Sequence, residues 1–348
     1  MSPVELVPCP LVDACGACTE LRVSAEQQAA RKLEVVSRAV GRAPDGFVAS
    51  PRALGYRARV RMKVGPDGRL GYHQPRSHAL VTVPMCAIAR PEINAVLAAM
   101  PPLPPELEAV ELRSDGERVL WLGTPPRRAA PGLGERVAAA GLEGVAGLQG
   151  AVLGGRLLFG EPRTRLEVAG VKHEVSATAF SQVNLEVNAL LVEAVRREVA
   201  RIQPSAVLDL YAGYGNLSLP LAAGGVKLTL IEENGAALAD ARRTAARLGC
   251  AVDARQGDAG RFRAGDAFFD VALLDPPREG APGVLEQILV TRPAAVIYVS
   301  CNVSALARDL RPLLRAGYRW ARLEVYDMFP QTAHVEALAV LHRPGVCP

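Results

Sequence analysis

Residues 206–222, AVLDLYAGYGNLSLPLA, decide the fold of this chain. The apolar segment 206–210 is typical of a buried strand, and a helical pattern follows from Leu217. Between them lies a turn with Gly213 and Gly215, where the missing side chains let the backbone approach a ligand closely. A strand, a glycine-rich turn and a helix in this order indicate the first unit of a nucleotide-binding α/β domain.

Four further apolar segments after this unit predict a parallel sheet, with acidic residues where strands end. Glu232 closes the second strand and Asp258 follows the third. Carboxylates at these positions can hydrogen-bond ribose hydroxyls. A dinucleotide fingerprint would place a third glycine three residues after Gly215, where this chain has Ser218. The pattern therefore favours S-adenosylmethionine over NAD, whereas glycines that serve only a tight turn would leave both acids unexplained.

Three reactive side chains are expected at the carboxyl edge of the same sheet. Asp275 follows the fourth strand, Cys301 follows the fifth, and Glu336 precedes a closing strand. A thiolate that adds to carbon 6 of uracil makes carbon 5 nucleophilic, a base must then remove the carbon 5 proton, and a polar group must hold the uracil edge. Alone, Cys301 would be interpreted as an inert buried thiol and Glu336 as a surface acid. Their combination predicts a nucleophile, a base and a uracil-binding carboxyl.

The N-terminal segment carries three cysteines, Cys9, Cys15 and Cys18, within a loop rich in proline and glycine. Cys86 is the only other cysteine before residue 250 and is the expected fourth ligand. Four thiolates can hold zinc or an iron–sulfur cluster. Zinc sites usually use two close cysteine pairs, so one tight triad with a distant partner favours a [4Fe-4S] cluster; zinc and free thiols are the alternatives.

Residues 56–64, YRARVRMKV, alternate in the manner of a strand, and a PDG turn at 66–68 predicts a hairpin. The pattern places four cations on one face of this strand, which suggests contact with RNA phosphates, although a solvated sheet face explains the pattern equally well. These cations are Arg57, Arg59, Arg61 and Lys63. Upstream, residues 20–42 read as an amphipathic helix with Ala25, Ala29 and Leu33 on its apolar side.

Composition limits the possible classes of protein. The chain has 348 residues, 49% of them hydrophobic, which is enough for two or three domains. A net charge of +4 permits a nucleic-acid partner without requiring one. Neither a signal peptide nor an apolar run of membrane-spanning length is visible, so we expect a cytoplasmic protein with no membrane association. Nothing indicates an obligate protein partner.

Four segments together resemble the RNA uracil-5-methyltransferase family: LDLYAGYGN, DPPREG, YVSCN and MFPQTAHVE. The cysteine spacing resembles the iron–sulfur branch of that family, the bacterial 23S rRNA 5-methyluridine enzymes. The resemblance covers nearly the whole chain. It implies a Rossmann-like class I methyltransferase domain, at residues 172–348, preceded by a small mixed β domain, at residues 1–171, that carries the iron–sulfur site and contacts RNA.

The resemblance also implies roles for particular residues. Cys301 resembles the nucleophile, Glu336 the base, and Asp275 the group that holds the target base. Cys9, Cys15, Cys18 and Cys86 resemble the cluster ligands. Positions similar to those that bind S-adenosylmethionine in the family are Gln182, Tyr211, Asn216, Glu232, Asp258 and Asp275.

The chain departs from the family in two respects. Only eight residues precede Cys9, so we expect no N-terminal RNA-binding TRAM domain, and the usual proline after SCN is Val303. The expected substrate is 23S rRNA, with tRNA as the alternative. Two other hypotheses stay open: an iron–sulfur RNA-binding relative without catalysis, and a small-molecule methyltransferase, although the latter would need neither the thiolate nor the cationic strand.

Overall fold

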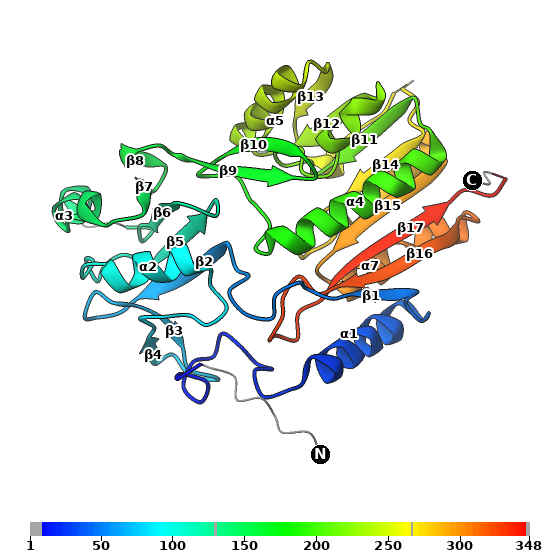
Figure 1. The fold of residues 1–348 in the computed structure, drawn as a ribbon. Helices are drawn as coiled ribbons and strands as arrows, with labels where there is room; N and C mark the ends of the chain where they lie inside the picture. Colours follow the sequence, from blue (N-terminus) through cyan, green and yellow to red (C-terminus); the bar gives the residue numbers. More distant parts are fainter. Residues whose placement is uncertain (1–8, 129–130, 266, 346–348) are drawn as a thin grey trace.

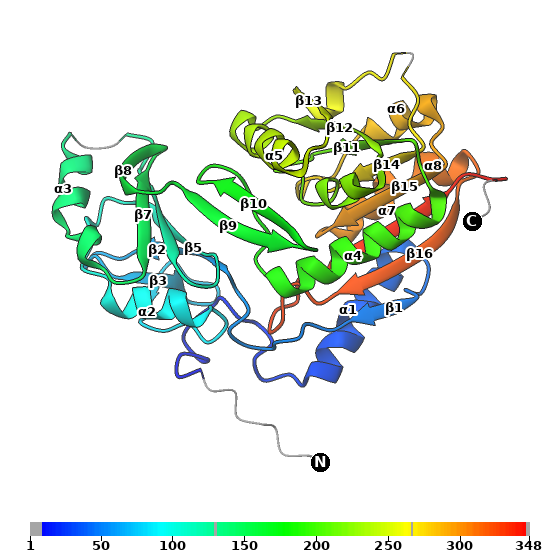
Figure 2. The same ribbon diagram turned by 45° about the horizontal axis from the view of Figure 1, so that its top comes forward.

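The computed structural model describes residues 9–128, 131–265 and 267–345. Its strands form a seven-stranded sheet, an eight-stranded sheet and a separate ladder of two strands. Figures 1 and 2 show the two large sheets in separate lobes, with the two-stranded ladder between them. Within the described ranges, none of the helices combines the length and the hydropathy needed to cross a membrane.

The seven-stranded sheet belongs to the N-terminal half. Its strand order is β4-β3-β2-β5-β6-β7-β8. The strands are β2 (Arg59–Val64), β3 (Leu70–His73), β4 (Leu80–Thr82), β5 (Ala109–Ser114), β6 (Val119–Thr124), β7 (Leu148–Leu153) and β8 (Arg156–Gly160). The helical segments are α2 (Pro91–Ala99), α3 (Leu133–Ala139) and the short 3-10 turn η1 (Leu142–Gly144).

The predicted hairpin after residue 64 is confirmed. Val60 and Met62 are buried while Arg61 is exposed, as the strand alternation requires. Gly68 has a φ of 75°. A Cβ atom there would lie 2.4 Å from the carbonyl oxygen of Leu103, so only glycine fits the turn.

The N-terminal sheet is mixed, as the expected small mixed β domain requires, because one pair of neighbouring strands departs from the antiparallel pairing of the others. β6 and β7 are parallel. The chain between them contains α3 and η1, and a connection that includes a helix can return the chain to the same end of the sheet.

The eight-stranded sheet has the order β1-β16-β17-β15-β14-β11-β12-β13. Its strands are β1 (Gly46–Val48), β11 (Ala206–Leu210), β12 (Lys227–Glu232), β13 (Val252–Gln256), β14 (Val271–Leu274), β15 (Ala295–Ser300), β16 (Arg319–Tyr326) and β17 (Glu336–His342). The five strands from β11 to β15 are parallel, and β17 runs antiparallel between β15 and β16. The predicted α/β sheet is therefore confirmed.

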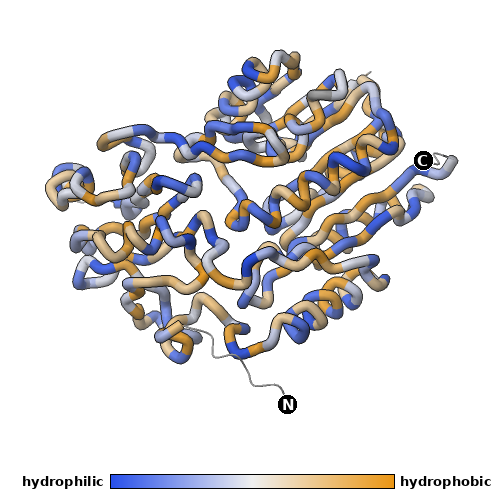
Figure 3. The backbone as a smooth tube through the Cα atoms, viewed as in Figure 1, coloured by the Kyte–Doolittle hydropathy of each residue, from blue (hydrophilic) through white to orange (hydrophobic). Residues whose placement is uncertain are grey.

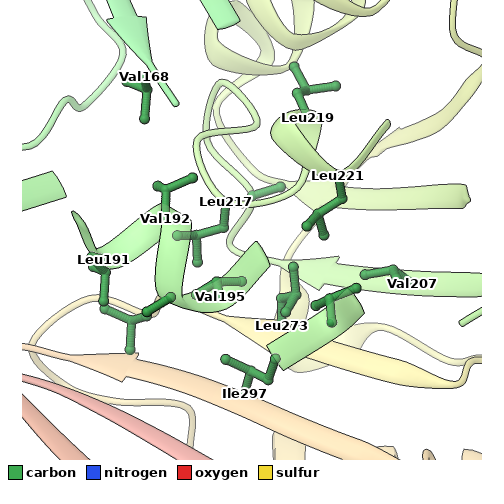
Figure 4. Packing of buried hydrophobic residues seen from close by; sticks show 14 of the residues in the cluster. Val168, Leu191, Val192, Val195, Val207, Leu217, Leu219, Leu221, Leu273 and Ile297 are labelled. Atoms are coloured by element: carbon green, nitrogen blue, oxygen red, sulfur yellow. The ribbon is translucent and has the colours of Figure 1, made fainter. Parts of the chain in front are cut away.

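Helices cover both faces of this sheet, which is why β14 and β15 are buried along their whole length. They are α4 (Leu185–Ile202), α5 (Gly235–Leu248), α6 (Val284–Thr291), α7 (Val303–Asp309) and α8 (Arg311–Arg315), with 3-10 turns η2 (Leu219–Gly224) and η3 (Ala259–Arg261). In Figure 4, Leu191 and Val195 of α4 pack beside Leu217, Leu273 and Ile297.

The helix predicted from Leu217 is only the short turn η2. Pro220 lies at its start and lacks a backbone N–H, and Gly225 ends it with a φ of 71°. The six residues of η2 contain one of these breakers and end at the other, which allows no longer helix.

The predicted N-terminal helix is present as α1 (Ala25–Val40), capped by Ser24 and ended by Gly41. Its buried residues are Gln28, Lys32 and Val36, so two polar side chains occupy the face against the sheet. Figure 3 shows hydrophilic and hydrophobic residues alternating along α1 and α4. The helix packs against α7 and β16, and β1 pairs in parallel with β16.

The first fifty residues thus contribute to both lobes. Cys15 and Cys18 pack against the core of the seven-stranded sheet, whereas α1 and β1 complete the eight-stranded one. The ladder between the lobes pairs β9 (Arg163–Val168) with β10 (Val171–Ser176) in antiparallel fashion. The boundary expected between residues 171 and 172 falls at the start of β10 and stays a prediction.

Candidate active site

A cavity of about 580 Å³ lies where β11, β12, β14 and β15 end. It brings together most of the predicted cofactor and catalytic residues. The predicted residues that line it are Gln182, Tyr211, Gly213, Asn216, Glu232, Asp258, Asp275, Cys301 and Glu336. Gly215 belongs to the same turn, with a φ of 81°, but does not line the cavity.

The glycine-rich turn is fastened by Glu232. One carboxylate oxygen accepts the backbone N–H of Gly213 at 2.9 Å, and the other accepts that of Asn234 at 2.7 Å. Tyr211 adopts a left-handed φ of 62°, which turns the chain sharply after β11. Carboxylate oxygens have further acceptor sites, so Glu232 can fix the turn and still bind a hydroxyl group.

Asn216 is buried and joins the turn to helix α4. Its amide exchanges two hydrogen bonds with the amide of Asn188, at 2.8 and 2.9 Å. The hydroxyl of Tyr214 donates to the same Asn216 oxygen at 3.0 Å, and His173 packs edge-on against the Tyr214 ring at 5.0 Å. These three supporting residues carry no sequence signal, because each acts through a contact with a distant segment.

Sheet register brings Cys301 and Glu336 together. Ser300, the last residue of β15, pairs with Ala337 of β17, and continuing this antiparallel register by one residue brings Cys301 opposite Glu336. Glu336 is only 2% exposed. The pairing therefore places a thiol and a buried carboxyl next to each other at the wall of the cavity.

The carboxyl groups of Asp275 and Glu336 both have raised pKa values. Burial raises the pKa of Asp275 to about 7. Burial and then the negative charge of Asp275 raise the pKa of Glu336 well above its usual value, while Arg278 opposes this. The side-chain amide of Gln182 donates to Asp275 at 3.3 Å. Two neighbouring buried carboxyls cannot both ionise easily, so they hold a proton near neutral pH.

Arg278 is a site residue to which sequence reasoning gave no role. Burial, with Glu336 adding, raises the pKa of the Cys301 thiol, and the Arg278 guanidinium opposes this rise. The backbone carbonyl of Arg278 accepts a hydrogen bond from Asn302 at 2.8 Å. Asn302 also caps α7, which begins at Val303 without the proline that is usual there. The sequence signal for this effect on the thiol is the position of Arg278 directly after the segment 275–277, at the same edge of the sheet as Cys301.

The four predicted RNA-binding cations have different surroundings. Arg59 lines the cavity, with its guanidinium 4.3 Å from the ring centroid of Phe180. Arg57 lies over the ring of Phe329 at 6.0 Å. Arg61 is exposed on β2, and Lys63 is paired with Glu108 at 3.3 Å. Two of the cations thus reach the cavity region, and two lie along the sheet.

Comparison with known proteins identifies the family. The family described as "tRNA (Uracil-5-)-methyltransferase" matches residues 262–344, and a "Methyltransferase domain" family matches residues 207–277. A "23S rRNA (uracil(1939)-C(5))-methyltransferase" of Dichelobacter nodosus is 31% identical over 98% of this chain and 85% of its own length. The chain belongs to the RNA uracil-5-methyltransferase family. An uncharacterized RNA methyltransferase of Thermosynechococcus vestitus is 34% identical over 96% of this chain and 83% of its own length.

The class I methyltransferase fold of this uracil-5-methyltransferase is confirmed by a solved relative. The Pyrococcus abyssi tRNA (uracil-54, C5)-methyltransferase, in complex with S-adenosyl-L-homocysteine, superposes with a TM-score of 0.76 at 21% identity. The match covers 94% of this chain and 86% of the archaeal one.

The four N-terminal cysteines of this family member lie around one small pocket. Cys9, Cys15, Cys18 and Cys86 line it, together with apolar residues such as Leu11 and Val83. Burial, and then the neighbouring Cys86 and Cys15, raise the pKa of Cys18 to about 12. Within the described ranges, no group of three or more His, Cys, Asp or Glu side chains is arranged to hold a single metal ion.

Proposed function

We propose that this chain transfers a methyl group from S-adenosylmethionine to carbon 5 of a uridine in 23S rRNA. The observation that carries the proposal is the placement of Cys301 opposite Glu336 at the wall of a cavity that also holds the glycine-rich turn. Relatives that share about a third of their residues with this chain over nearly its whole length are named for 23S rRNA. They favour rRNA over tRNA.

We assign the methyl donor to the part of the cavity between the glycine-rich turn and Asp258. Glu232 and Asp258 would bind the nucleoside, and Gln182, Tyr211 and Asn216 would complete the site. When bound, S-adenosylmethionine supplies an electrophilic methyl group on its sulfonium. The uracil would then lie between Cys301, Glu336 and Asp275.

The reaction assigns one task to each of these three side chains. The thiolate of Cys301 adds to carbon 6, and the displaced electron pair makes carbon 5 an enolate-like nucleophile that accepts the methyl group. The Glu336 carboxylate then takes the carbon 5 proton; the electrons of that C–H bond restore the C5=C6 double bond, and the S–C6 bond breaks. For Glu336 to act as a carboxylate base, the proton shared by the two carboxyls must lie on Asp275 when the uracil is bound; the protonated Asp275 then donates a hydrogen bond to O4 of the enolate and keeps its proton.

We also propose that Cys9, Cys15, Cys18 and Cys86 hold a [4Fe-4S] cluster. The donor set fits, because four thiols surround one pocket whose other lining residues, such as Leu11, Val83 and Met85, are apolar. A single zinc ion with metal–sulfur bonds of about 2.3 Å needs sulfur atoms closer together than a cubic cluster does. The visible absorption of the purified protein and its iron and zinc contents test this assignment: zinc without iron would overturn it.

We propose that residues 1–171 grip the RNA and that residues 172–348 carry out methyl transfer. Arg59 at the cavity supports this division, and the exposed Arg61 extends the contact along β2. Arg61→Ala should weaken binding to all RNA sequences alike and reduce the slope of log affinity against log salt by about one. An unchanged salt slope would remove Arg61 from the interface.

The test of the proposed function uses RNA that contains 5-fluorouracil. Fluorine cannot leave carbon 5 as a proton does, so the enzyme stalls as a covalent adduct after methyl transfer. Wild type with S-adenosylmethionine should give a denaturation-resistant band on 23S rRNA fragments, and Cys301→Ala should give none. A band on tRNA alone would transfer the proposal to tRNA, and no band on either RNA, with methyl donor bound, would overturn it.

A further inference from the structure

We infer that Gln28 and Lys32, two buried polar side chains on α1, are positioning residues for the proton-removal step. The inference rests on the proposed function, because it assigns that step to Glu336. Both side chains bind the segment 327–335, which joins β16 to β17 and leads directly into Glu336. Neither residue lines the cavity, so both act through this segment.

Lys32 is 1% exposed although it carries an ammonium group. Its Nζ donates to the Asp327 carboxylate at 2.6 Å and to the Phe329 carbonyl at 3.0 Å. A buried ammonium group is tolerated only when such partners replace its water. One side chain therefore fixes the start of the segment and the backbone at Phe329, whose ring lines the cavity.

Gln28 fixes the middle of the same segment. Its amide nitrogen donates to the Gln331 side-chain oxygen at 3.0 Å, and its amide oxygen accepts the Gln331 backbone N–H at 2.9 Å. Gln331 has a left-handed φ of 66°, a conformation that is uncommon for residues other than glycine. The Gln28 amide also donates to the carbonyls of Glu20 and Val23.

Other contacts to this segment also come from the N-terminal part of the chain. The backbone N–H of Glu20 donates to the Gln331 carbonyl at 3.1 Å, and the Tyr56 hydroxyl donates to the Pro330 carbonyl at 3.0 Å. Glu20 lies two residues after Cys18 in the sequence. The cysteine-bearing loop and α1 therefore hold the approach to Glu336 jointly.

The nucleophile has supports that involve neither Gln28 nor Lys32, although α1 also packs against α7. Cys301 follows β15 and precedes α7, and Asn302 ties that junction to Arg278. Glu336 is instead the first residue of β17, where strand pairing ends, so its orientation depends on the segment before it. Loosening that segment should displace the base while the thiol and the cofactor turn stay in place. Addition and methyl transfer should then proceed, and elimination should slow.

The variant Gln28→Met tests this inference, with Gln27→Met as its matched control. Gln27 is the neighbouring residue on α1 and its side chain is exposed. On ordinary uridine RNA, Gln28→Met should accumulate a denaturation-resistant adduct and turn over on the order of tenfold more slowly. Gln27→Met should behave as wild type. Binding of S-adenosylmethionine and adduct formation with 5-fluorouracil RNA should be unchanged in both variants.

Two further variants make the outcome decisive. Glu336→Gln sets the adduct level expected when the base is absent, and Lys32→Met repeats the test should Gln28→Met fail to fold. The inference fails if a folded Gln28→Met or Lys32→Met variant leaves no adduct on ordinary RNA while Glu336→Gln does leave one. In that case the proposed function still stands. If wild type forms no adduct with fluorinated RNA, the proposed function fails first, and the inference fails with it.

Discussion

Replacing Asp209 with asparagine should stabilise the protein, and increasingly so as pH rises. Asp209 lies on β11, is 1% exposed, and one of its carboxylate oxygens has no hydrogen-bond partner among the described residues. Burial, with the charges of Asp275 and Glu232 adding, raises the pKa of its carboxyl from 3.8 to about 7. The folded state therefore binds a proton that the unfolded state releases, and stability falls as pH rises between these two values.

The magnitude follows from this difference in pKa. One unit of pKa difference is worth about 1.4 kcal/mol, so the raised pKa of Asp209 lowers the free energy of unfolding by about 4 kcal/mol at pH 8. About 2.5 kcal/mol of this loss develops between pH 5 and pH 8. Asparagine has nearly the same shape and does not ionise, so Asp209→Asn should lose this pH dependence. Comparing the same variant at two pH values cancels the constant cost of the buried amide.

The assay is denaturant unfolding of wild type and Asp209→Asn at pH 5 and pH 8. The exposed Asp253 of β13, in the same sheet, provides the control variant Asp253→Asn, which should change stability by less than about 0.5 kcal/mol at either pH. An Asp209→Asn advantage that is equal at both pH values would refute the reasoning, because burial of a charge must depend on its titration.

Three other substitutions test the site and its supports. Arg278→Met removes the cation that opposes the raised pKa of the Cys301 thiol, so less thiolate should be present at pH 7. Alkylation of Cys301 at pH 7, followed by peptide mass spectrometry, should slow by about threefold to tenfold. An unchanged rate would contradict this role. Burial lowers the pKa of His173 to about 4, so wild type should lose up to about 3 kcal/mol of stability as pH falls from 6.5 to 4. His173→Phe should not show this loss, and thermal unfolding of both proteins at the two pH values measures it. Tyr298→Phe deletes the hydroxyl that donates to Asp309 at 2.7 Å and should cost about 1–3 kcal/mol in denaturant unfolding; a neutral effect would show that water replaces the bond.

The parts of the site that the sequence predicts are those set by local pattern. Strands such as β14 and β15 are continuous apolar runs, and parallel strands present their carboxyl ends at one edge. That rule suffices to bring Asp275, Cys301 and Glu232 to one cavity. To predict that Cys301 lies opposite Glu336, one must also know that β17 runs antiparallel to β15. The closing strand after residue 336 suggests this direction.

The parts that the sequence does not predict depend on contacts between distant residues. Hydrophobic periodicity assigns polar positions of a helix to solvent, yet Gln28 and Lys32 face the protein because partners some 300 residues later satisfy them. Phe180 is 56% exposed and still belongs to the cavity, through its contact with Arg59. Likewise, nothing within β1 indicates that this short strand joins the C-terminal sheet.

The position of β1 has a consequence for synthesis on the ribosome. Its partner β16 lies more than 270 residues later in the chain. At about 5–20 residues per second, translation separates the two strands by tens of seconds, during which the seven-stranded sheet can fold while α1 and β1 lack their partner. Chains stalled before Arg319 should therefore leave α1 open to protease, and full-length chains released from the ribosome should protect it.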